Sequence, residues 1–62
     1  MIVKSNTPLS DNELRRVREI LLISSYPSES LQMAFPGVRI KLTDDTLFVG
    51  NPPWDLTQEI QL

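Results

Sequence analysis

Two runs of alternating apolar and polar residues, separated by a short acidic segment, most constrain what this chain can fold into. Residues 38–42 read Val-Arg-Ile-Lys-Leu, and residues 47–49 repeat the alternation after Asp44-Asp45. Strict alternation is typical of strands with one buried face, and a short polar loop between two such strands indicates a β-hairpin. The sequence therefore predicts an antiparallel hairpin.

The apolar pattern also predicts the register of this hairpin. With a two-residue loop, the apolar side chains of the two runs face one another on the same side of the ribbon. The resulting pairs are Leu42 with Leu47 and Ile40 with Val49. Lys41 then lies opposite Phe48 on the other side. A three-residue loop would set Leu42 against a threonine, so a two- or four-residue turn is favoured.

A helix is predicted to follow Ser10. The segment Ser10-Asp11-Asn12-Glu13 has the form of a capping box, in which the serine and glutamate side chains each accept a backbone N–H bond from the other residue. Leu14, Val17 and Leu21 share one face of this helix and form its predicted core stripe. The helix is expected to end near Ser25, because the following residue precedes a proline and is steered away from helical geometry.

Around these elements the sequence predicts an α+β fold, taken as a single small domain over residues 1–62. A second helix of one or two turns is expected to start at Pro27 and to stop before Pro36-Gly37. The β-favouring residues 1–4 predict a short edge strand, and residues 55–62 fit either a strand or a weakly capped helix. Strands from the two termini would extend the hairpin into a small antiparallel sheet.

Composition removes most catalytic chemistry. The 62 residues contain no Cys and no His, and only two glycines. The chain therefore has no disulfide framework, no zinc-ligand set, no histidine general base, no cysteine nucleophile and no glycine-rich phosphate loop. Asp44 and Asp45 are the one adjacent carboxylate pair, and a hairpin tip would leave both in water. We expect no catalytic residues, no metal and no cofactor, and hence not an enzyme.

The small size of the chain and its lack of disulfides and metal ligands favour self-association. A 62-residue chain buries a small core, and with neither disulfides nor a structural metal the remaining source of stability is oligomerisation. Leu22 and Ile23 fall off the core stripe of the predicted helix, so its last turn is apolar nearly all round. We expect another element or a second subunit to cover them, and we expect a homo-oligomer.

Two aromatic residues are further candidates for partner binding. The alternation places Phe48 on the outer face of the hairpin beside Arg39 and Lys41, where the ring is either shielded by the cationic side chains, packed under another segment, or available to a partner. Trp54 follows two prolines. It is either a core residue or the tip of a stiff, exposed hook for another protein.

A DNA-binding alternative rests on the cationic residues. Arg15 and Arg16 on the predicted helix, together with Arg39 and Lys41 on the hairpin, could contact phosphates. Two helices followed by a β-ribbon loosely resemble the end of a winged-helix DNA-binding domain, which implies a wing carrying Arg39 and Lys41, although such a domain normally has one more helix. The net charge of −2 weighs against binding driven by phosphate neutralisation.

The expectation for function is therefore a small non-enzymatic interaction or regulatory module that binds another macromolecule, with a protein favoured over nucleic acid. The longest apolar run, Ile20 to Ile23, is far too short to span a membrane, and residues 1–3 contain no basic leader. We expect a cytoplasmic protein with no membrane partner.

Overall fold

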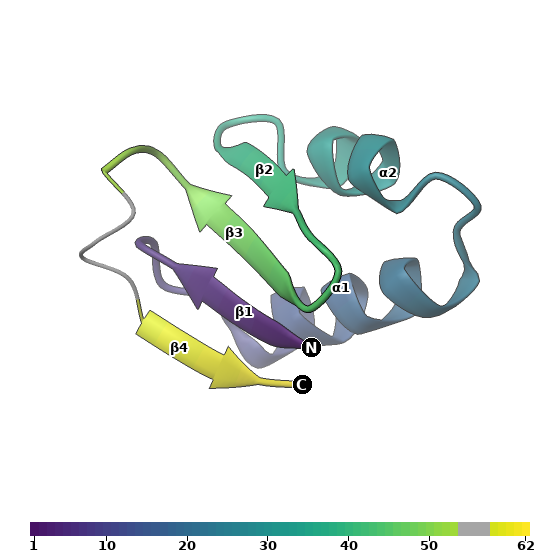
Figure 1. Ribbon diagram of the computed structural model, residues 1–62, viewed down its shortest axis with the longest axis horizontal. Helices are drawn as coiled ribbons and strands as arrows, with labels where there is room; N and C mark the ends of the chain where they lie inside the picture. The colour runs from purple at the N-terminus through teal and green to yellow at the C-terminus, as the bar shows by residue number, and fades with distance from the viewer. Residues whose placement is uncertain (54–57) are drawn as a thin grey trace.

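Two helices and a four-stranded sheet form the two layers of the computed structural model, which describes residues 1–53 and 58–62 (Figure 1). In chain order the elements are β1 (Ile2–Ser5), α1 (Asp11–Ile23), α2 (Pro27–Ala34), β2 (Arg39–Leu42), β3 (Thr46–Gly50) and β4 (Gln58–Gln61). The predicted α+β class, with a main helix, a short second helix and strands from both termini, is confirmed.

The sheet has the strand order β2-β3-β1-β4 and is mixed. β1 runs parallel to β3, whereas β2 with β3 and β1 with β4 are antiparallel. The prediction of an edge strand at residues 1–4 was wrong, because β1 lies between two other strands, and the sheet is not entirely antiparallel. The parallel pairing arises because the chain crosses from β1 through both helices and β2 before β3 returns beside β1 in the same direction, and β1 is interior because β4 pairs with its other side.

The predicted hairpin register is confirmed. Leu42 pairs with Leu47, and Ile40 pairs with Val49. The backbone N–H of Thr43 donates to the carbonyl of Thr46 at 2.8 Å, which leaves Asp44-Asp45 as the two-residue loop. The ribbon does not project as a free wing, since β3 is an interior strand hydrogen-bonded to β1.

Both helices begin where the sequence predicted. At the start of α1, the Ser10 hydroxyl accepts from the Glu13 N–H at 3.2 Å, and the Glu13 carboxylate accepts from the Ser10 N–H at 2.8 Å. The Ser10 backbone N–H, and after it the Ser10 hydroxyl, hold the pKa of the Glu13 carboxyl below its ordinary value. α1 ends at Ile23, slightly before the predicted end, and α2 starts on Pro27, which needs no hydrogen-bond partner in a first helical turn.

The core lies between the helices and one face of the sheet. Among the described residues, five apolar side chains are fully buried: Val3, Val17, Leu31, Leu47 and Val49. Ile40, Leu42 and Ile60 pack against this core from the same face of the sheet, and the strand residues that alternate with the core-facing ones lie on the opposite face, which neither helix covers. Figure 1 shows both helices on the same side of the sheet. The molecule therefore has an open sheet face and an outer helix surface.

Gln32 of α2 protects the free edge of β2. Its side-chain amide donates to the carbonyl of Val38 at 2.7 Å and accepts from the backbone N–H of Ile40 at 3.3 Å. These two bonds occupy backbone groups that a neighbouring strand would otherwise use. The contact fixes α2 over the edge of the sheet.

Asn6 fastens the end of β3 to the turn after β1. Its side-chain oxygen accepts from the Asn51 N–H at 3.1 Å, and its amide nitrogen donates to the carbonyls of Asn51 and Pro53. Gly50 has φ of 130°, and a Cβ built there would lie 1.6 Å from the Asn6 side-chain oxygen. Glycine is thus required at this position both for backbone geometry and for space.

We expect Gly50→Ala to destabilise the fold by on the order of 2 kcal/mol or more, because the new methyl group collides with Asn6 and the backbone angle is strained for an L-residue. Gly37→Ala is the matched control, since a Cβ there meets nothing within 4 Å. Urea denaturation followed by circular dichroism measures both. Equal midpoints for the two variants would contradict the assignment.

Ser10→Ala is expected to lower the free energy of unfolding by about 1 kcal/mol through loss of the N-cap acceptor. It should also raise the pKa of the Glu13 carboxyl toward its ordinary value. Because the folded pKa is lowered, the contribution of Glu13 is present above its unfolded pKa and is lost as the pH falls through the folded value. An NMR titration of the Glu13 side chain measures the shift, which should be partial because the backbone N–H of residue 10 remains; an unchanged free energy of unfolding in the variant would refute the capping role.

Candidate functional site

One side of α1 lies along α2 and carries both charged and apolar residues. Arg16, Glu19, Ile20 and Ile23 recur at i, i+3, i+4 and i+7 and therefore share one side of the helix. Ile20 also packs against the core, whereas Ile23 is exposed. This face thus runs from a charged end to an apolar end near the turn into α2.

The second helix forms the other wall of a groove. A hydrogen bond of 2.8 Å joins the hydroxyls of Ser24 and Ser30, and the Ser24 hydroxyl also accepts from the Tyr26 N–H at 3.1 Å. These bonds hold the start of α2 beside the end of α1. The hollow between the helices has a volume of about 460 Å³. We call it the α1–α2 groove, and its lining residues are Arg16, Glu19, Ile20, Ile23, Ser30, Met33 and Ala34.

Large apolar side chains stand exposed in and around this groove. The exposed fractions are 78% for Leu22, 82% for Ile23, 71% for Tyr26 and 82% for Met33. Leu22 lines a different, smaller hollow of about 260 Å³ with Met1, Arg18, Leu21 and Leu62. Single exposed apolar residues are ordinary on protein surfaces, whereas Ile23 and Met33 line one groove together.

The charged residues of the groove have no charged partner within the described part of the chain. Arg16 and Glu19 are both exposed, and the ion pair found among the described residues joins Lys4 to Glu59 instead. One positive and one negative side chain therefore stand next to the apolar surface. Such an arrangement suits a protein partner with opposite charges at matching positions.

The open sheet face presents a different chemistry. Phe48 lies between two lysines, with the Nζ atoms of Lys4 and Lys41 at 5.7 Å and 5.8 Å from the centre of its ring. Each cation–π contact of this kind contributes roughly 0.5–1 kcal/mol at an exposed site. Together with Arg39, this face gathers three of the six cationic residues of the chain. The ring is half-buried, so it is already engaged within the molecule.

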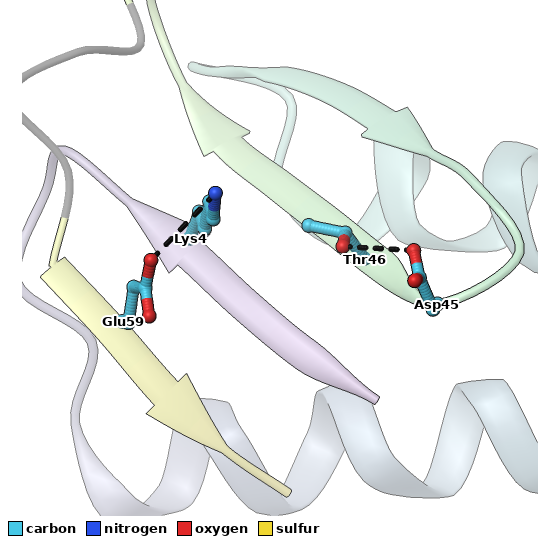
Figure 2. A network of polar contacts seen from close by, with 4 residues as sticks. All are labelled: Lys4, Asp45, Thr46 and Glu59. Atoms are coloured by element: carbon cyan, nitrogen blue, oxygen red, sulfur yellow. Dashed lines mark hydrogen bonds and ion pairs between the residues drawn. The ribbon is translucent and has the colours of Figure 1, made fainter.

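Acidic groups on this side of the molecule are held in local contacts (Figure 2). The Nζ atom of Lys4 lies 3.6 Å from a Glu59 carboxylate oxygen, across the β1–β4 pairing. At the hairpin loop, the Thr46 hydroxyl donates to the Asp45 carboxylate at 3.0 Å. In residues 1–53 and 58–62, no group of three or more acidic side chains lies close enough to hold a metal ion.

The candidate residues from the sequence separate into two surfaces. Leu22 and Ile23 lie on the helix side and are exposed. Phe48, Arg39 and Lys41 gather on the open sheet face. Trp54 lies outside the described residues.

The residues of the DNA-binding alternative are likewise divided between the two layers. Arg15 and Arg16 belong to α1, on the opposite side of the sheet from Arg39 and Lys41. The structure therefore does not bring the four cations together on one surface.

Sequence reasoning missed Tyr26 and Met33. Met33 lies on α2, off the predicted inward face of this helix, and Tyr26 lies in the turn before it. The sequence does indicate that Met33 is an apolar residue outside the stripe formed by Leu31 and Ala34. Its significance depends on α1 lying alongside, and a local pattern does not contain that information.

Comparisons with models of known protein families, with curated proteins and with solved structures found no match. Neither helix in the described part of the chain has the length and apolar character needed to cross a bilayer.

The two apolar residues of α2 should respond very differently to truncation. Leu31→Ala is expected to cost about 3 kcal/mol, because Leu31 is fully buried and its removal leaves a cavity. Met33→Ala should change the stability of the dilute protein by less than about 0.5 kcal/mol, because Met33 is exposed. Chemical denaturation at low micromolar concentration measures both. A large loss for Met33→Ala would contradict the exposed position of this side chain.

Proposed function

We propose that this chain is a small non-enzymatic interaction module that acts by binding another protein through the α1–α2 groove and the apolar residues around it. The observation that carries the proposal is the pair Ile23 and Met33, each 82% exposed, which line the same groove from the two helices. Leaving them in water is unfavourable, and covering them with a partner supplies a driving force of roughly 25 cal/mol per Å² of apolar area removed from water.

The composition of the surface supports a protein as the partner. Tyr and Met are enriched in the buried centres of interfaces, and Ile23 and Met33 occupy the apolar part of the groove. Arg16, Glu19 and Ser30 provide polar groups beside it. A surface with an apolar centre and a mixed polar border resembles a binding site for another folded surface more than a pocket for a small charged ligand.

The sequence supports a binding role without chemistry. The chain has neither His nor Cys, the side chains that most often supply general bases and nucleophiles near neutral pH. We include a cytoplasmic location in the proposal, since the longest apolar run is the four residues Ile20 to Ile23. The proposal favours a protein over DNA, because the cations that would contact phosphates lie on opposite layers of the molecule.

Affinity capture with surface variants tests this function. We expect proteins retained from a lysate of the source cells by the immobilised wild-type chain to be lost with Ile23→Asp and Met33→Asp, because each introduces a charge into the apolar groove. The control is Arg39→Gln on the open sheet face, which should retain them. Bound proteins are identified by mass spectrometry against immobilised albumin as background.

Retention by both groove variants with loss on Arg39→Gln would move the binding site to the sheet and overturn the proposal. Circular dichroism of each variant establishes that the fold is intact, so that a loss of binding reports on the surface. Wild-type capture no different from albumin would also count against a protein-binding role.

A further inference from the structure

We infer that the protein bound at the α1–α2 groove is a second copy of this chain, so that the groove is the interface of a two-fold symmetric dimer. The inference rests on the proposed function, since it names the partner of the same surface. Three observations carry it: the area available, the pair of unmatched charges, and the small core of the single chain.

The exposed area fits a dimer of small subunits. The described chain exposes 4270 Å² in total, of which a standard interface of about 800 Å² per partner would cover roughly a fifth. Ile23 and Met33, which line the groove, supply on the order of 300 Å² of this, and the rest of the groove lining adds to it.

The charges of the groove are complementary to those of the same groove in a second copy. In a two-fold contact, residue i of one subunit touches residue j of the other, and j touches i in return. A surface carrying one Arg and one Glu therefore forms two identical ion pairs when Arg16 meets the partner's Glu19. A groove with charges of one sign would repel its own copy, whereas this groove contains both signs three residues apart on one helix.

Because the core is small, dimerisation would add to the stability of the fold. Five apolar side chains are fully buried among the described residues, and the chain has no disulfide to restrict its unfolded state. Covering Ile23 and Met33 in both subunits would add apolar burial that the isolated chain cannot make. Dimerisation would then stabilise the fold by mass action, and the unfolding temperature would rise with protein concentration.

Sedimentation equilibrium over a hundredfold concentration range is the first test. We expect the wild-type chain to approach twice its mass of 7.1 kDa at the higher concentrations, and Ile23→Asp to remain monomeric while keeping its helical circular dichroism. A wild-type monomer throughout the range overturns the inference. A dimer that Ile23→Asp leaves unchanged overturns it equally, because the contact then lies elsewhere.

Complementary charge reversal tests the ion pairs directly. Arg16→Glu and Glu19→Arg should each weaken self-association about tenfold or more, because each places like charges opposite one another across the two-fold axis. An equimolar mixture of the two variants should form a heterodimer, since every facing pair is then opposite in sign. Arg15→Glu is the matched control: it makes the same charge change next to the groove lining and should leave the dimer intact.

The mixing experiment uses one variant with a fluorescent label and follows its sedimentation with and without the other. Absence of mixed species, with each variant self-associating like the wild type, would overturn the assigned pairs. A wild-type monomer whose groove variants still lose captured proteins would remove the second copy as partner and leave the proposed function standing. If the wild type is monomeric and capture is unaffected by the groove variants, both fall.

Discussion

The parallel pairing of β1 with β3 is the contact on which the rest of this structure depends. It places Val3 against Leu47 in register and joins a strand near the start of the chain to the hairpin that forms much later. Parallel neighbours cannot be linked by a tight turn, so the chain must cross from one end of the sheet to the other between them. Here both helices and β2 make that crossing, and the helices consequently cover one face of the sheet.

This central pair then requires its ends and edges to be secured. Asn6, directly after β1, binds the backbone after β3 and keeps Gly50 in close contact, so the two strands end together. β4 completes the other side of β1, and Gln32 closes the edge of β2. Free strand edges invite pairing with other chains, and a side-chain amide that occupies the edge removes that opportunity. The sheet itself is therefore poorly suited to assembly through β2, in contrast to the helix surface.

The sequence predicted those features of the fold whose interacting residues lie close together along the chain. The capping box at Ser10 and Glu13 and the hairpin register around Leu42 are set by residues within a few positions, and both were predicted correctly. The interior position of β1 was not, because its partner lies more than forty residues away and alternation does not distinguish an edge from an interior strand. The same limit concealed the roles of Asn6 and Gln32, whose partners become neighbours only after folding.

The candidate site shows the same division between local and distant information. Ile23 was identified from the helical pattern of α1 alone, because it lies off the stripe that packs on the sheet. Met33 was not, since its neighbour across the groove belongs to another helix. The sequence offered Arg16 only as a possible phosphate contact and did not single out Glu19, and the groove gives these two residues a common location.

The exposed outer face of α1 follows from how the second helix is used. α2 has eight residues, and its buried side is directed at the core through Leu31 while Gln32 holds the edge of β2. A helix of two turns engaged in these contacts cannot also cover Leu22 and Ile23 at the end of α1. Moving α2 to cover them would expose the edge of β2 and remove Leu31 from the core. Within this chain, covering the edge of the sheet and covering the outer apolar face are therefore competing uses of the same short helix, and the outer face stays exposed.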